Sequence, residues 1–356
     1  MPWFDLPPEQ LLEHRTHAEE PAGLDEWWSH RLAQAKAAAR PATIARYRPD
    51  VYGLMQAYDV EFSGAGGDRI RAWYLRPPGA GDEPLPVVVQ FIGYGGGRGL
   101  PADHAMLPAA GFAVFVMDTR GQGGRWTVGA TGDIGPGPEY SAVMTRGIAS
   151  PDGYYYTRLY ADAVLAVEAA AGLDGVDSDR VAVSGASQGG GLALATAALL
   201  GGAVAVCHAD IPFLCDISRA ITLTGKMPYA EIAEFLAQHV DLVPAALDTL
   251  RYIDCALLAR RITADCLLSV GLMDEVCPPS TVFAAYNEIT ASKDIAVFPF
   301  GVHAVPSAHL ETQLGHLRDR LGRRPSGRGA SQADRVRQPG ERALPAEQLD
   351  GLIQRR

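Results

Sequence analysis

The sequence predicts an α/β fold in which a mostly parallel sheet carries helices on both faces. Short apolar runs rich in β-branched residues recur along the chain, and they are apolar throughout rather than at alternate positions. Strands of parallel sheets have this character because both of their faces are buried. Alanine-rich or amphipathic stretches of helical length separate several of these runs. We therefore expect strands at 87–91, 113–117, 181–183, 204–207, 266–270 and 295–298, and helices at 160–171, 190–200 and 280–289.

The first part of the chain predicts a helical extension followed by an antiparallel edge of the sheet. The extension covers residues 1–50 and is expected to be mostly helical up to residue 40, with Leu11-Leu12 and Trp27-Trp28 as apolar anchors. Two strand-like runs then follow at 55–62 and 70–75. The segment between them is rich in Gly, Ser and Asp, which is typical of the turn of a hairpin.

Residues 1–320 are predicted to form a single domain, and two segments stand out from its pattern. Residues 211–262 replace the strand–helix alternation with two short helical stretches, at 231–239 and 245–250. Ligands of open α/β sheets bind at the carboxyl ends of the strands, so we interpret this insertion as part of a lid, with a packing appendage as the alternative. Residues 321–356 are rich in Arg, Gly and Pro and are predicted to be disordered, with a basic binding arm as the alternative.

Charge and hydropathy exclude two classes of partner. The 356 residues carry a formal net charge of -10, and an acidic body repels the phosphate backbone of nucleic acids. No apolar run approaches the roughly 20 residues that a membrane-spanning helix requires. We therefore expect a small-molecule substrate, with neither nucleic acid nor membrane as a partner.

Cysteine usage and the N-terminus predict a cytoplasmic protein. The five cysteines form no C-x-x-C pair, and the first residues lack a basic segment followed by an apolar core. Reduced thiols are therefore expected. No H-E-x-x-H sequence occurs, so neither a metal nor another cofactor is implied. Cys277 lies near a candidate catalytic residue, and we expect it to line the core or a pocket wall.

The strongest local motif is Gly185-Ala186-Ser187-Gln188-Gly189, which matches G-x-S-x-G. A strand precedes it and an Ala/Leu-rich helix follows, which is the context of a nucleophile held on a strained corner above a sheet. Ser187 is therefore the predicted nucleophile. The alternative is a glycine-rich turn in which Ser187 only caps the helix.

A serine nucleophile requires a base that is held by an acid, and in this fold the chain order is Ser, acid, His. Asp274 follows one predicted strand and His303 follows the next, so both open onto the carboxyl edge of the sheet. Glu275 is the alternative acid, with Asp274 then capping a helix. His309 and His316 are alternative bases, but they fall in a helical stretch and are expected at the surface.

The oxyanion of such a reaction requires two preorganised N–H groups. One is predicted to be the main-chain N–H of Gln188, the residue after the nucleophile, and the other the N–H of Tyr94 in the glycine-rich loop after the strand at 87–91. A plain turn is the alternative for this loop. A phosphate-binding loop is disfavoured because no G-K-[ST] sequence follows.

The segment Arg120-Gly121-Gln122 follows another predicted strand. Arg120 is permanently charged, so it either pairs with a carboxylate that fixes the loops of the site or lies at the surface as a strand-end arginine. Gln122 is grouped with it as a supporting residue.

Taken together, these segments resemble the acetyl xylan esterase / cephalosporin C deacetylase family of α/β-hydrolases. The resemblance runs from the N-terminus to Leu321. It is carried by an arginine–glycine–glutamine motif, by the glycine–x–serine–glutamine–glycine motif, by the acid segment and by a tyrosine run, at residues 120–122, 185–189, 269–287 and 154–158.

The resemblance implies the same triad and the same oxyanion donors, and it adds Pro228 near a pocket for a small acyl group. It implies release of acetate from acetylated xylo-oligosaccharides and from the acetyl ester of cephalosporins, in a cytoplasmic homohexamer. The sequence departs from the family at Ala304, where a glutamate is usual, and at Ile92, where a histidine is usual. A peptidase or thioesterase on the same scaffold, or an impaired member that binds without turnover, remain the alternatives.

Overall fold

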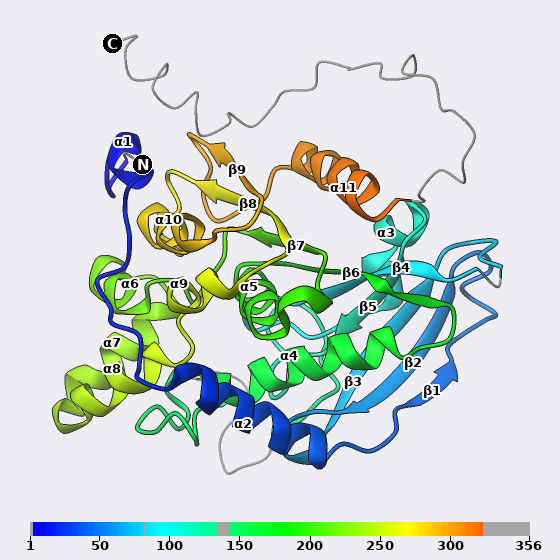
Figure 1. Cartoon of the computed structure of the whole chain (residues 1–356), viewed down its shortest axis with the longest axis horizontal. Helices are drawn as coiled ribbons and strands as arrows, with labels where there is room; N and C mark the ends of the chain where they lie inside the picture. The colour runs from blue at the N-terminus through cyan, green and yellow to red at the C-terminus, as the bar shows by residue number, and fades with distance from the viewer. Residues whose placement is uncertain (1–2, 82, 134–142, 323–356) are drawn as a thin grey trace, which may run out of the picture.

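The sheet is mixed, and it confirms the predicted fold class. The computed structural model describes residues 3–81, 83–133 and 143–322, so the segment 323–356 of the predicted disordered tail lies outside the described residues. Nine strands pair in the order β1-β2-β3-β5-β4-β6-β7-β8-β9, with helices on both faces (Figure 1). The strands are β1 (Thr43–Arg46), β2 (Gln56–Ser63), β3 (Arg69–Arg76), β4 (Leu85–Phe91), β5 (Ala113–Met117), β6 (Val176–Ala186), β7 (Val206–Asp210), β8 (Asp265–Gly271) and β9 (Lys293–Phe298).

The pairing directions divide the sheet into two parts. Strands β1, β2, β3 and β5 pair antiparallel with one another, whereas β5, β4, β6, β7, β8 and β9 form a continuous parallel block. The predicted hairpin is β2–β3, at the antiparallel edge. Strand β1 was not predicted, because all four of its residues are exposed and carry no apolar pattern.

Side chains alternate between two apolar layers across the sheet, as the pleat requires. In β4, Val87 and Val89 belong to the larger core, and Val88 belongs to a second, smaller core on the other face. Helices α4 and α5 pack on the first face, and Leu317 and Leu321 of α11 contribute to the second core. The helices of the central fold are α3 (Met106–Ala109), α4 (Tyr155–Ala171), α5 (Gln188–Leu200), α10 (Pro279–Glu288) and α11 (Ser307–Leu321).

The N-terminal extension is less helical than expected. Only α1 (Pro8–Leu11) and α2 (Leu24–Ala37) form in its described part, and one proline, Pro21, and the positive-φ Gly23 lie just before α2. The predicted anchors Leu11 and Trp28 are both buried, and the Trp28 ring stacks on Tyr160 of α4 at 5.9 Å between centroids. The extension is therefore part of the main core.

Residues between β7 and β8 form the predicted insertion and contain more helices than the sequence indicated. Two of them were expected, α7 (Tyr229–Gln238) and α8 (Val243–Arg251), whereas α6 (Ile217–Leu223) and α9 (Cys255–Leu258) were not. Across the described part of the chain, no helix combines the length and apolar character that crossing a membrane would require.

Candidate active site

Ser187 occupies a sharp corner between β6 and α5. Its backbone has φ +57° and ψ -119°, a left-handed conformation that is strained for a residue with a side chain. The corner is held because the Ser187 N–H donates to the Asp210 carbonyl at 2.9 Å, while its own carbonyl accepts the N–H of Phe213 at 2.9 Å. The Ser187 side chain makes no capping hydrogen bond to α5, so it is not used as a helix cap.

The two glycines of the motif are required by close backbone approach. A Cβ on Gly185 would collide with the main chain of Gly189, and a Cβ on Gly189 would collide with the Phe91 carbonyl at the end of β4. The turn can therefore bend back on itself only when both positions lack a side chain. This packing places the start of α5 directly beside the loop that follows β4.

The structure brings Ser187, His303 and Asp274 into one hydrogen-bonded chain. The Ser187 hydroxyl lies 2.9 Å from His303 Nε2, and His303 Nδ1 lies 2.8 Å from Asp274 Oδ2. These partners fit a neutral imidazole whose Nδ1–H donates to the carboxylate and whose Nε2 accepts from the serine. Asp274 is fully buried, while the His303 side chain keeps 27% exposure on the side open to solvent.

The acid position belongs geometrically to Asp274 rather than to Glu275. The second oxygen of Asp274 accepts the N–H groups of Val276 at 2.8 Å and Cys277 at 3.0 Å, so it also holds the turn before α10. Glu275 instead faces Lys226, with 3.4 Å between its Oε2 and the lysine Nζ. Asp274 does not cap α10, whose first turn receives no side-chain cap, so the structure favours its predicted place as the acid.

The other two candidate histidines lie away from the relay. Both are on α11 as expected, but the expectation of a surface position is wrong for His309, which is 3% exposed with Nε2 at 3.0 Å from Asp210 Oδ1. Gln313 of the same helix donates to the other oxygen of Asp210 at 2.8 Å. His316 lies 2.9 Å from His208 and 3.1 Å from Asp265. The inward face of α11 carries polar groups, and these groups lie against the Asp210 carboxylate. Buried polar groups usually pair in this way.

The two main-chain N–H groups predicted to bind the oxyanion, those of Tyr94 and Gln188, are free of protein acceptors in the described part of the chain. Gln188 is the first residue of α5, where helical N–H groups have no partner within the helix. Tyr94 lies in the loop after β4, which contacts α5 through Gly189. The predicted pair of oxyanion donors is therefore unoccupied and placed on two adjoining loops.

Gln122 connects these two loops. Its Oε1 accepts the Gly95 N–H at 2.6 Å, and its Nε2 donates to Gln188 Oε1 at 2.9 Å. The Gln188 side chain is fully buried, and it also accepts the Tyr156 hydroxyl at 2.9 Å and donates to the Ile92 carbonyl at 3.1 Å. The Gln188 amide therefore holds the start of α5 against the loop after β4, the loop after β5 and α4.

Arg120 is completely buried, so the surface alternative does not apply. Its guanidinium binds Asp162 of α4 through two hydrogen bonds of 2.5 and 2.7 Å, and Nη1 donates to Asp68 at 2.9 Å. Burial lowers the pKa of Arg120, but Asp162 and Asp68 outweigh this effect and raise the pKa above its usual value. The Arg120 carbonyl accepts the Tyr155 hydroxyl at 2.5 Å. Arg120 thus joins the strand end, the hairpin turn and α4.

Pro228 is buried at the N-terminus of α7, and its role at an acyl pocket stays a prediction. The segment before it is fastened to the acid turn, because the Thr224 hydroxyl donates to the Glu275 carbonyl and Lys226 pairs with the Glu275 side chain. Ala304 is exposed directly after His303, where the resemblance would place a glutamate.

Cys277 lies next to the relay but is not suited to act as a nucleophile. It is fully buried, and burial together with the Asp274 charge raises the pKa of its thiol well above the usual value. Ligand atoms of Asp274, Cys277 and His303 lie within 4.8 Å of one another, the spacing of a possible metal-binding trio. Asp274 and His303 are however already bonded to each other, so a metal would have to break the relay.

Sequence reasoning missed two residues that contact the Tyr94 loop. The Trp126 Nε1–H donates to the Tyr94 carbonyl at 2.9 Å, and the Tyr94 hydroxyl donates to Glu231 Oε1 at 2.7 Å. A tryptophan in a glycine-rich segment was the available signal for Trp126. Glu231 is 137 residues from Tyr94 and shows no local pattern, so nothing in the sequence marked it.

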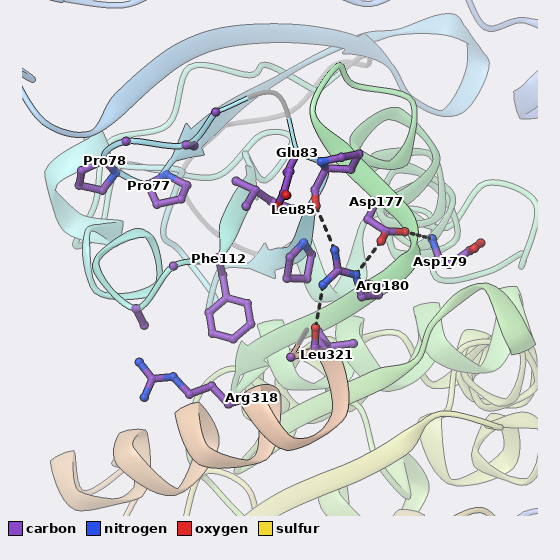
Figure 2. A pocket seen from close by; sticks show the side chains of 18 residues that line it. Pro77, Pro78, Glu83, Leu85, Phe112, Asp177, Asp179, Arg180, Arg318 and Leu321 are labelled. Atoms are coloured by element: carbon purple, nitrogen blue, oxygen red, sulfur yellow. Dashed lines mark hydrogen bonds and ion pairs between the residues drawn. The ribbon is translucent and has the colours of Figure 1, made fainter. Parts of the chain in front are cut away.

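A cavity of about 950 Å³ lies at the opposite edge of the sheet (Figure 2). It is bordered by the residues just before β4 and β5 and by the N-terminal half of β6, which is the amino edge of the parallel block. Arg180 crosses its wall and binds Asp177, the Pro84 carbonyl and the Leu321 carbonyl, as the dashed lines show. Ser187 lies at the carboxyl edge, so this cavity is separate from the candidate site.

Comparisons with known proteins agree with this geometry. The family described as acetyl xylan esterase (AXE1) matches residues 1–320. Acetyl esterase Axe7A of Xylanibacter ruminicola is 27% identical over 312 residues, which are 86% of this chain and 69% of that protein. The acetyl xylan esterase of Paenibacillus sp. R4 superposes with a TM-score of 0.82 at 32% identity, covering 89% of this chain and 100% of that chain. Acetyl xylan esterase 1 of Thermoanaerobacterium sp. JW/SL YS485 gives 0.81 at 34% identity, with 89% and 99% covered. The chain therefore belongs to the acetyl xylan esterase family of carboxylic ester hydrolases.

Proposed function

We propose that the protein is a serine esterase that removes acetyl groups from acetylated sugars through an acyl-enzyme on Ser187. The observation that carries the proposal is the continuous hydrogen-bonded chain from Ser187 through His303 to Asp274. The main-chain N–H groups of Tyr94 and Gln188, which donate to no acceptor among the described residues, support it. A chain of this kind supports turnover rather than binding alone, although Ala304 replaces the glutamate of the family.

In acylation, Ser187 Oγ forms a bond to the carbonyl carbon of the ester while its proton passes to His303 Nε2. The carbonyl π electrons move onto oxygen, and the N–H groups of Tyr94 and Gln188 stabilise that oxyanion. Asp274 stabilises the imidazolium that forms. Collapse of the tetrahedral intermediate breaks the bond to the sugar oxygen, which takes the proton from His303 and leaves as an alcohol.

In deacylation, His303 Nε2 takes a proton from water as the water oxygen attacks the acetyl carbonyl carbon. The same two N–H groups stabilise the second oxyanion. Collapse then breaks the bond to Ser187 Oγ, which regains the proton from His303 while acetic acid is released. No metal or other cofactor enters either half of this sequence.

The acetylated sugar is proposed from the family and from the named activities of its relatives, two acetyl xylan esterases and an acetyl esterase. The resemblance extends the proposal to the acetyl ester of cephalosporins, to Pro228 as part of a pocket for a small acyl group, and to a cytoplasmic homohexamer. Five free, buried cysteines fit a reducing compartment. Light scattering of the purified protein tests the hexamer, and a monomer at micromolar concentration would refute it.

The decisive test of the reaction is Ser187→Ala assayed on p-nitrophenyl acetate and on acetylated xylo-oligosaccharides. We expect kcat to fall by about 10⁴-fold or more, because no nucleophile remains. Ser184→Ala, three residues earlier and within β6, is the matched control and should retain activity. Wild-type kcat/KM should fall steeply from acetate to butyrate esters. Full activity of Ser187→Ala, or faster cleavage of peptides or thioesters than of acetyl sugars, would overturn the proposal.

A further inference from the structure

Glu231 ties the insertion to the loop that holds one oxyanion donor. Its Oε1 accepts the hydroxyl of Tyr94 at 2.7 Å, and its Oε2 lies 3.4 Å from the Met144 N–H in the short helix Val143–Thr145. Glu231 itself is in the first turn of α7, where its own N–H donates to the Pro228 carbonyl. One half-buried carboxylate therefore joins three segments that are remote in the sequence.

The Tyr94 hydroxyl is a permanent donor in this contact. Burial, together with the negative charge of Glu231, raises the pKa of Tyr94 well above its usual value. The phenol therefore stays protonated across the working pH range, and a bond from a neutral donor to a carboxylate is stronger than one between two neutral groups.

The hydrogen bonds of the loop backbone leave one rotation to be restrained through the Tyr94 side chain, which packs against the main core and is hydrogen-bonded to Glu231. The peptide between Tyr94 and Gly95 is held at both ends, since its carbonyl accepts the Trp126 Nε1–H at 2.9 Å and its N–H donates to Gln122 at 2.6 Å. The preceding peptide carries the Tyr94 N–H that is proposed to bind the oxyanion. Its carbonyl, on Gly93, accepts the N–H of Gly96, within the same loop, at 3.1 Å, and no other donor among the described residues reaches it. The Tyr94 side chain, anchored at Glu231, thus fixes the angle between these two peptides.

We propose that Glu231 is a positioning residue for the ester hydrolysis, acting through the Tyr94 hydroxyl to aim the Tyr94 N–H at the oxyanion. The inference rests on the proposed function. It also gives the insertion a function, because α7 would support the loop that carries Tyr94 through this hydrogen bond. A displacement of about 1 Å in a group that stabilises the transition state costs up to about a hundredfold in rate, whereas ground-state binding of the ester hardly depends on it.

The test compares Tyr94→Phe, Glu231→Ala, Glu231→Gln and the Tyr94→Phe/Glu231→Ala double variant with the wild type on p-nitrophenyl acetate. Glu234→Ala is the matched control, since it removes an exposed carboxylate one turn further along α7. We expect kcat to fall about tenfold or more in Tyr94→Phe and in Glu231→Ala, with KM within about twofold. The double variant should be no worse than either single one, and Glu231→Gln, which keeps an acceptor oxygen, should recover most of the rate.

Affinity for phenylboronic acid supplies a readout that a merely structural role would not change. The boronate forms a tetrahedral adduct with the serine and places an oxygen in the oxyanion site, so its inhibition constant should rise in parallel with the loss in kcat. Tyr94→Phe removes only the hydroxyl oxygen, so it still tests the Tyr94–Glu231 contact if Glu231→Ala does not fold. Wild-type kcat and boronate affinity in Tyr94→Phe, or additive losses in the double variant, would refute the role of Glu231. An inactive wild-type protein would instead refute the proposed function.

Discussion

The side-chain amides of Gln122 and Gln188 meet at 2.9 Å, with Gln122 Nε2 donating to Gln188 Oε1. Gln122 comes from the loop after β5 and Gln188 from the first turn of α5, so the contact joins two segments that are 66 residues apart. Because Gln122 also accepts the Gly95 N–H, it sets the spacing between the two proposed oxyanion donors.

Substitutions at Gln122 should therefore lower kcat more than they raise KM. In Gln122→Met the side-chain hydrogen bonds with Gly95, Gln188 and Tyr155 are lost, and we expect kcat on p-nitrophenyl acetate to fall by about 10- to 100-fold. Gln122→Glu keeps the acceptor for Gly95 but cannot donate to Gln188, so its loss should be intermediate. Unchanged kcat in Gln122→Met, with folding verified by circular dichroism, would contradict this role.

Replacement of the two neighbouring acids should separate their roles. Asp274→Asn keeps the shape of the side chain but favours the wrong tautomer of His303, and we expect kcat to fall by about 10⁴-fold. Glu275→Gln removes a carboxylate that faces Lys226, and its kcat should stay within about twofold of the wild type. Steady-state kinetics on p-nitrophenyl acetate measures both. A larger loss in Glu275→Gln than in Asp274→Asn would reassign the acid.

Arg120 should be required for stability more than for chemistry. Arg120→Met would leave the carboxylate of Asp162 buried without its partner, which typically costs about 3–5 kcal/mol of unfolding free energy. Arg15→Met, which breaks the partly exposed pair with Glu288, should cost less than about 1 kcal/mol. Urea unfolding followed by tryptophan fluorescence measures the unfolding free energy of both variants. Equal decreases would show that the buried ion pair of Arg120 contributes no more than the exposed pair of Arg15.

His208 should make the protein sensitive to acid. Burial, and then the neighbouring His316, lower its pKa to about 3, against the partial compensation of Asp210. The unfolded chain takes up this proton below about pH 6.5 and the folded chain does not, so stability falls as the pH decreases from 6.5 toward 3. Between pH 8 and pH 5 this one group should contribute about 2 kcal/mol of lost stability.

The variant His208→Leu should remove that contribution, because no titrating group remains at the position. Urea unfolding at pH 8 and at pH 5 gives the free energy of unfolding at each pH. The decrease in this free energy from pH 8 to pH 5 should be about 2 kcal/mol smaller in the variant than in the wild type. His239→Leu, at an exposed position, is the control and should keep the wild-type difference. An unaltered pH dependence in His208→Leu would show that His208 is already charged in the folded protein.

The sequence predicted those parts of the fold whose signal is local. The parallel strands are apolar on both faces, and the corner at Ser187 is marked by small residues that its backbone conformation requires. Both signals arise within about ten residues, so no knowledge of the packing is needed to detect them. Strand β1 escaped prediction because hydrogen bonding to β2, rather than an apolar pattern, defines it.

The support of the candidate site was not predictable to the same degree. Arg120 and Gln122 were singled out, but their partners Asp162 and Gln188 come from other elements and are chosen by packing. Buried polar side chains must find partners, but the sequence does not say which ones. His309 was misplaced for the same reason, because an amphipathic helix gives no sign that its inner face will meet a carboxylate.

Asp210 links α11 to the backbone of the nucleophile, although α11 supplies none of the reacting groups. The Asp210 carbonyl accepts the Ser187 N–H, and the Asp210 carboxylate accepts a hydrogen bond from Gln313 and lies 3.0 Å from His309 Nε2. A chain cut after Pro306 would retain the serine, the histidine and the aspartate of the relay, yet it would strip that carboxylate of its helix partners. The shortest fragment worth expressing therefore extends through Leu321, and an affinity tag belongs beyond it.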